Sequence, residues 1–114
     1  MLLGMHWKGI IIGKEINMED IKALCKNIAD HYGYPAQSNQ LMEECAELIQ
    51  AVNKYKRAKT SDAQYIAFRN YVEEIADVEI MLEQIKYLIN VKEQDLNETK
   101  LYKLHRTIER YEHG

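Results

Sequence analysis

Two short acidic motifs have the residue types and the spacing of a metal site. They are Glu43-Glu44-x-x-Glu47 and Glu73-Glu74-x-x-Asp77. Residues three apart share a helical face, so each motif directs two carboxylates to the same side of a helix. Hard divalent cations bind carboxylate oxygens, and Mg²⁺ commonly combines a few carboxylates with waters and substrate phosphates. The motifs therefore indicate metal-dependent phosphate chemistry rather than metal storage.

The two motifs lie at mirror-related positions about a turn predicted at residues 60–61. Glu44 lies as far before this turn as Asp77 lies after it, and the same holds for Glu47 and Glu74. Residues equally far from the turn of an antiparallel helix hairpin lie at the same level. Four carboxylates are therefore predicted to meet across one helix pair. Without a cation they repel one another and raise one another's pKa values, whereas a divalent cation binds them.

The alternative interpretation is that these glutamates lie on solvated helix faces, where glutamate favours helix formation. However, Glu44 adjoins the apolar stripe of its helix, beside Cys45 and three residues after Leu41, and Glu74 adjoins Ile75 in the same way. A carboxylate at the edge of an apolar stripe loses hydration free energy unless it gains a partner. The stripe position and the mirrored spacing together favour the metal site.

The helices that must position these motifs follow from apolar periodicity, and no segment has the alternation of a strand. The first predicted helix covers residues 18–31. The segment Tyr32-Gly33-Tyr34-Pro35 ends it, because glycine suits a C-terminal cap and the residue before proline avoids helical angles. A second helix covers about residues 39–58, capped by Ser38 or Asn39.

Two further helices follow the predicted turn. Ser61-Asp62-Ala63-Gln64 has the capping-box pattern and marks the start of a third helix, in which apolar residues continue at steps of three and four for about 28 residues. Asp95 or Asn97 caps a fourth. We expect an all-α, four-helix bundle-like domain built on an antiparallel helix hairpin. The third helix has more apolar surface than its neighbours can cover, which predicts an oligomer.

Length and composition limit the class of protein. A chain of 114 residues supports one domain, and 46% hydrophobic and 29% charged residues are typical of a folded helical protein. The net charge of -3 argues against stable nucleic-acid binding. Cys25 and Cys45 lie in apolar helical patterns, where they are expected to pack, and with no disulfide framework they indicate a reducing cytoplasm. No apolar run approaches the roughly 20 residues that span a bilayer, so we expect no membrane association.

The segment from residue 1 to residue 17 is interpreted as an extension without a structural role. Gly13 to Met18 can be encoded by codons that place AAGGAG a few bases before AUG, which resembles a bacterial ribosome-binding sequence. We therefore expect a natural start at Met18 and a domain covering residues 18–114. Chance is the alternative, and the codons decide between the two.

The acidic motifs and the hairpin between them resemble the signature of the all-α nucleoside triphosphate pyrophosphohydrolases. This is the MazG-like superfamily, which includes dimeric dUTPases and phosphoribosyl-ATP pyrophosphohydrolases. Residues 41–48 and 73–78 carry the strongest resemblance, which extends over most of residues 18–111. It implies Mg²⁺-dependent hydrolysis of a nucleoside triphosphate to monophosphate and pyrophosphate, with Mn²⁺ as a substitute, in a homodimer or homotetramer. The implied metal ligands are Glu44, Glu47, Glu74 and Asp77.

Two residues of the second predicted helix are candidates for roles beside the metal. Glu43 is the candidate catalytic residue, which positions and deprotonates the attacking water. Because it points about 100° away from Glu44, a partner of the metal ligands or an exposed helix residue is an equally good interpretation. Gln40, one turn before Glu44, is the candidate for reading a base edge.

Basic residues are candidates for binding the triphosphate. Lys103, Arg106 and Arg110 share a helical face, which makes a stripe that can reach phosphate oxygens. A solvated face that pairs with Glu109 is an equally good interpretation. Lys54, together with Arg57, lies about two turns beyond the first acidic motif and is a weaker candidate of the same kind.

Two alternatives to this function stay open. Within the enzyme class, the substrate can be dUTP, dCTP or another phosphate ester, because the metal site alone does not choose among them. In a different class, the chain is a helical interaction protein that keeps the acidic motifs for structure, or binds a nucleotide without turning it over.

Overall fold

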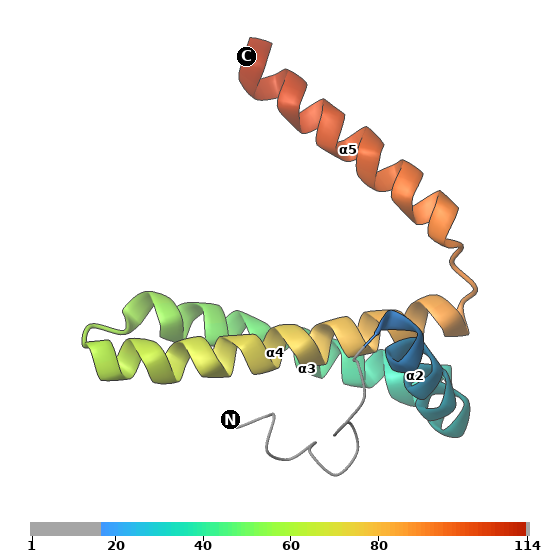
Figure 1. Ribbon diagram of the computed structural model, residues 1–114, viewed down its shortest axis with the longest axis horizontal. Coiled ribbons are helices and arrows are strands. Elements are labelled where there is room, and N and C mark those ends of the chain that lie inside the picture. The colour runs from blue at the N-terminus through green and yellow to red at the C-terminus, as the bar shows by residue number, and fades with distance from the viewer. Residues whose placement is uncertain (1–16, 114) are drawn as a thin grey trace.

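The computed structural model describes residues 17–113, which form four α-helices (Figure 1). They are α2 (Met18–Tyr32), α3 (Tyr34–Arg57), α4 (Ser61–Leu88) and α5 (Glu93–His113). No strand occurs in this range, so the predicted all-α class is confirmed. Of the predicted extension, only Asn17 is described. Its side chain caps α2 by accepting a hydrogen bond from the backbone N–H of Asp20 at 3.0 Å.

None of the helices within residues 17–113 is both long enough and apolar enough to cross a membrane.

The helices α3 and α4 lie side by side and run in opposite directions (Figure 1). The buried Gln37 side chain donates a hydrogen bond of 2.8 Å to the Gln84 side chain, which ties the start of α3 to the end of α4. Nearer the connecting loop, the rings of Tyr55 and Tyr71 meet edge to face. Ala51 of α3 is 0% exposed. These contacts hold the two helices in a single register.

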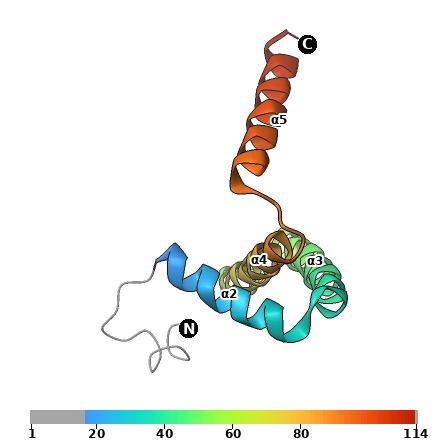
Figure 2. The same ribbon diagram turned by 90° about the vertical axis from the view of Figure 1, so that its right-hand side faces the viewer.

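The helix α2 lies across the end of the α3–α4 pair (Figure 2). Cys25 and Ala29 are buried in this contact, and the Cys25 Sγ lies 3.8 Å from the Ile80 carbonyl oxygen. The Tyr87 hydroxyl donates to the Asp30 carboxylate at 2.6 Å. The packing role predicted for Cys25 is confirmed. The packing role predicted for Cys45 is wrong within one chain, because this residue lies exposed on α3.

The helix α5 stands apart from the other three (Figures 1 and 2). Apart from the ion pair between Lys86 of α4 and Glu93, it packs against none of the other helices within residues 17–113, and it buries none of its residues. The four-helix bundle expected from the sequence is therefore not formed inside one chain. Three helices pack together, and the fourth projects from them.

The end of α4 explains this direction. Asn90 has a φ of 59°, the left-handed conformation that often ends helices, and the Val91 N–H donates to the Lys86 carbonyl at 2.8 Å. The Lys86 ammonium lies 3.3 Å from the Glu83 carboxylate and 3.4 Å from that of Glu93. The ion pair between Lys86 and Glu93 joins the last turn of α4 to the first turn of α5.

Two helix starts and one capping residue differ from the prediction. Helix α3 begins at Tyr34 instead of about residue 39, because Pro35 lies in the first turn, where its missing N–H breaks no intrahelical hydrogen bond. Helix α4 begins at Ser61 as predicted, but the capping hydroxyl belongs to Thr60. Helix α5 begins at Glu93, before either predicted capping residue.

Candidate metal centre

Three of the predicted ligands converge between α3 and α4. Glu44, Glu74 and Asp77 each offer one carboxylate oxygen, and these oxygens lie within 4.8 Å of one another. All three residues are partly buried. One comes from α3 and two come from α4, so the cluster depends on the antiparallel register that brings Glu44 level with Asp77.

Two oxygens of this cluster are buried without a hydrogen-bond partner. They are Oε1 of Glu44 and Oε1 of Glu74. The other oxygen of Glu44 accepts a hydrogen bond of 2.8 Å from the Gln40 side-chain amide. Buried carboxylate oxygens without partners cost free energy, and a cation supplies the missing partner. Three carboxylate oxygens are a donor set that suits Mg²⁺.

Burial and neighbouring charge raise the pKa values of two of these acids. Burial is the largest cause for both Glu74 and Asp77. The Asp77 charge then raises the pKa of Glu74, and the Glu44 charge raises the pKa of Asp77. Glu47 contributes to both increases. This is the repulsion that carboxylates experience when they gather without a cation.

These shifts predict the pH dependence of stability in EDTA. The pKa values of Glu74 and Asp77 are higher in the folded protein than in the unfolded chain, so their contribution to stability is complete below about pH 4. It is lost as the pH rises through the folded-state values. We expect the melting temperature in EDTA to fall over this range, and to fall less in Glu74→Gln or Asp77→Asn, each of which removes one of the two groups. An equal fall in both variants and the wild type contradicts the prediction.

The remaining acids of the two motifs, Glu43, Glu47 and Glu73, are exposed and are not part of the three-residue cluster. Glu47 is exposed and is not one of the three clustered residues, although its charge acts on Glu74 and Asp77. Glu43 is exposed on α3. Of the four carboxylates that were predicted to converge, three do so. The fourth, Glu47, lies close enough for its charge to raise the pKa values of Glu74 and Asp77.

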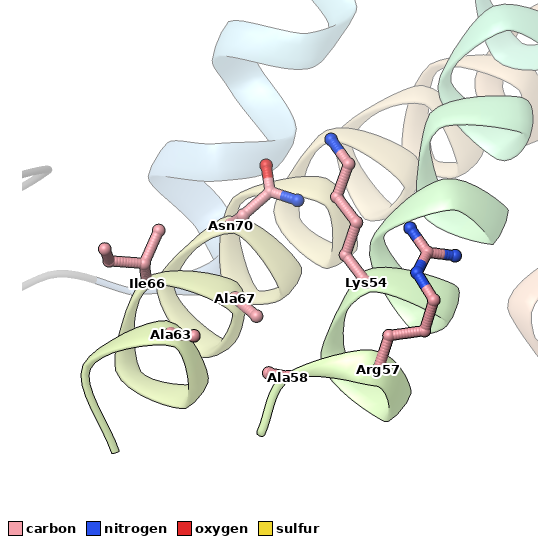
Figure 3. Close-up of a pocket in the computed structure, with 7 residues that line it drawn as sticks. All are labelled: Lys54, Arg57, Ala58, Ala63, Ile66, Ala67 and Asn70. Carbon is pink, nitrogen blue, oxygen red and sulfur yellow. The ribbon is translucent and has the colours of Figure 1, made fainter. Parts of the chain in front are cut away.

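The candidate substrate-binding residues lie in three different places. Gln40 holds the Glu44 carboxylate in position. Lys54 lines a pocket beyond the cluster (Figure 3). The basic residues of α5, Lys103, Arg106 and Arg110, belong to the helix that does not pack against α3 or α4. Within one chain, the fold does not bring these three to the carboxylates.

Asn70 lines the same pocket and was missed by the sequence analysis. A signal was available, since Asn70 precedes Asp77 by seven residues, close to two full turns, and therefore shares its helical face. Lys54 follows Glu47 by the same interval. A spacing of seven residues from an acidic motif thus identifies Lys54 and Asn70 as side chains on the same faces of α3 and α4 as Glu47 and Asp77.

No protein-family model, curated protein or solved structure matches this chain. Its function is therefore inferred from the carboxylate cluster and the spacing of the motifs.

Proposed function

We propose that this protein is a Mg²⁺-dependent nucleoside triphosphate pyrophosphohydrolase of the MazG-like kind, with a housekeeping role in the nucleotide pool. One observation carries the proposal. Glu44, Glu74 and Asp77 place three carboxylate oxygens within 4.8 Å, and two buried oxygens of the cluster have no partner. A cation that also binds phosphate accounts for this arrangement better than a solvated acidic surface does, because a solvated surface leaves no oxygen buried.

The residues of the cluster divide the work of hydrolysis. Glu44, Glu74 and Asp77 hold the metal, with Glu47 at the edge of the cluster as a fourth candidate ligand. When bound, Mg²⁺ neutralises phosphate charge as a Lewis acid. The water oxygen bonds to the α phosphorus, the bond from that phosphorus to the α–β bridging oxygen breaks, and pyrophosphate leaves with this oxygen. A carboxylate accepts the proton of the water, and Glu43 is the candidate for this base.

Association of copies is part of the proposal. Apolar side chains of α4 and α5 lie exposed along one stripe on each helix, which supports a homodimer or homotetramer. They are Phe68, Ile75 and Leu82 on α4, and Leu101, Leu104, Ile108 and Tyr111 on α5. A cytoplasmic location is proposed from the composition. dUTP, dCTP or another phosphate ester are alternative substrates, and a helical protein without catalytic activity is the alternative from another class.

A panel of canonical and modified nucleoside triphosphates tests the activity. Malachite green detects inorganic phosphate but not pyrophosphate, so we expect a signal only when inorganic pyrophosphatase and Mg²⁺ are both present. EDTA present during the incubation should abolish it even when excess Mg²⁺ and pyrophosphatase are added after heat has stopped the reaction. Phosphate release without pyrophosphatase would identify a phosphatase instead. No release from any triphosphate would remove the enzyme claim and leave the non-catalytic alternative.

A further inference from the structure

A pocket beside the connecting loop of α3 and α4 is lined by two cations and by no carboxylate (Figure 3). Its volume is about 540 Å³, and its lining residues are Lys54, Arg57, Ala58, Ala63, Ile66, Ala67 and Asn70. Within residues 17–113, Lys54 and Arg57 form no ion pair and no side-chain hydrogen bond. Both side chains are exposed, and two cations without a partner in this range, at a pocket with no carboxylate, can attract an anion.

The pocket lies on the carboxylate side of the helix pair. Lys54 follows Glu47, and Asn70 precedes Asp77, by seven residues each, which corresponds to about 10 Å along a helix. Side chains on a helix tilt toward its N-terminus. Lys54 therefore leans from the pocket toward the level of Glu47, and Asp77 leans toward the level of Asn70. Lys54 lies ten residues after Glu44, about 15 Å along the helix, so an anion that binds at both the carboxylate cluster and the pocket must be elongated.

We infer that this pocket binds the leaving pyrophosphate, that is, the β and γ phosphates of the triphosphate, through Lys54 and Arg57. The inference rests on the proposed function and names the part of the substrate that the pocket takes. When the bond between the α phosphorus and the bridging oxygen breaks, negative charge develops on the departing pyrophosphate. Cations at that end stabilise the charge, whereas the basic residues of α5 contact neither α3 nor α4. A nucleoside diphosphate presents one phosphate fewer, so the pocket selects triphosphates.

Binding of inorganic pyrophosphate tests the inference without turnover. Isothermal titration calorimetry in Mg²⁺ should show at least about tenfold weaker binding for Lys54→Ala/Arg57→Ala than for the wild type, because two charge-assisted contacts are lost. The matched control is Lys56→Ala/Lys59→Ala, which removes the same charge from exposed residues outside the pocket. The control should stay within about twofold of the wild type, since exposed charges away from the ligand are screened by salt.

Steady-state kinetics give a second readout. The ratio of kcat/KM for a triphosphate to kcat/KM for the matching diphosphate should fall about tenfold in Lys54→Ala/Arg57→Ala, as the pyrophosphate affinity does. The ratio should stay unchanged in Lys56→Ala/Lys59→Ala. Circular dichroism checks that each variant folds, and Lys54→Gln/Arg57→Gln replaces the alanine pair if it does not.

The outcomes separate this inference from the proposed activity. Equal pyrophosphate affinity in all variants, or an equal loss in the control, overturns the pocket assignment. Tighter binding of a nucleoside monophosphate than of pyrophosphate through the same two residues also overturns it. Pyrophosphate binding that depends on Lys54 and Arg57, without hydrolysis of any triphosphate, supports the pocket and rejects the enzyme. If the protein hydrolyses triphosphates and its preference for them over diphosphates is unchanged in the Lys54/Arg57 variants, the enzyme is supported and the pocket assignment is rejected.

Discussion

Replacing Asp77 with asparagine is expected to lower the proposed magnesium-dependent pyrophosphate release by about 100-fold or more, because it removes the charge of a proposed metal ligand. An oxygen of Asp77 lies within 4.8 Å of oxygens from Glu44 and Glu74, and these three residues are the proposed donor set. Asparagine keeps the size of the side chain, so the α3–α4 packing should persist. The coupled phosphate assay, run over a range of Mg²⁺ concentrations, measures the loss.

The control for this variant is Glu79→Gln, which removes one charge from an exposed position two residues further along α4. Its turnover should match that of the wild type. In EDTA, Asp77→Asn should melt at the same temperature as the wild type or higher, since it relieves carboxylate repulsion. Wild-type turnover in Asp77→Asn would show that the ligands are misassigned. A lower melting temperature in EDTA would show that Asp77 stabilises the fold instead.

Replacing Ala51 with leucine should destabilise the protein by about 1–3 kcal/mol, because the larger side chain overpacks a filled interior. Ala51 is 0% exposed in α3, one turn beyond Leu48 and four residues after Glu47. For a domain near 100 residues, each kcal/mol lowers the melting temperature by roughly 4–8 °C. Thermal unfolding followed by circular dichroism measures the effect.

The same variant should also affect the proposed metal site. If leucine moves α3 away from α4, the carboxylate of Glu44 moves away from those of Glu74 and Asp77, and the stabilisation by Mg²⁺ should shrink. Ala46→Leu makes the same change at an exposed position of α3 and should leave both properties unaltered. A wild-type melting temperature in Ala51→Leu would contradict the close packing of the two helices at this level.

The positions of the helices were largely predictable, because local chemistry determines them. Apolar steps of three and four predicted α4, and polar residues near 60–61 predicted the turn before it. The start of α3 was misjudged since Pro35 acts as a helix breaker inside a helix but is tolerated in its first turn. The shift of the α4 cap from Ser61 to Thr60 has a similar origin, because neighbouring hydroxyls offer the same chemistry.

The path of α5 was not predictable from periodicity. The apolar stripe of Leu101, Leu104 and Ile108 is the pattern of a packed helix, yet these residues are exposed in one chain. An apolar stripe indicates that a helix packs against another apolar surface, but it does not specify whether that surface belongs to the same chain or to another copy. The left-handed Asn90 and the bridging Lys86 determine the direction, and both effects depend on side-chain and backbone conformations that a pattern does not contain.

By itself, the sequence determined which helical face and which level each carboxylate occupies, because the helical period and equal distance from a turn are properties of residue order. The tertiary structure alone decided that Glu44, Glu74 and Asp77 converge while Glu47 stays exposed, and that two of their oxygens lose every partner. Burial and orphaned hydrogen-bonding atoms arise from the rotamers and the close approach of two helices. Residue spacing cannot specify these, and they are the features that support a metal at this site.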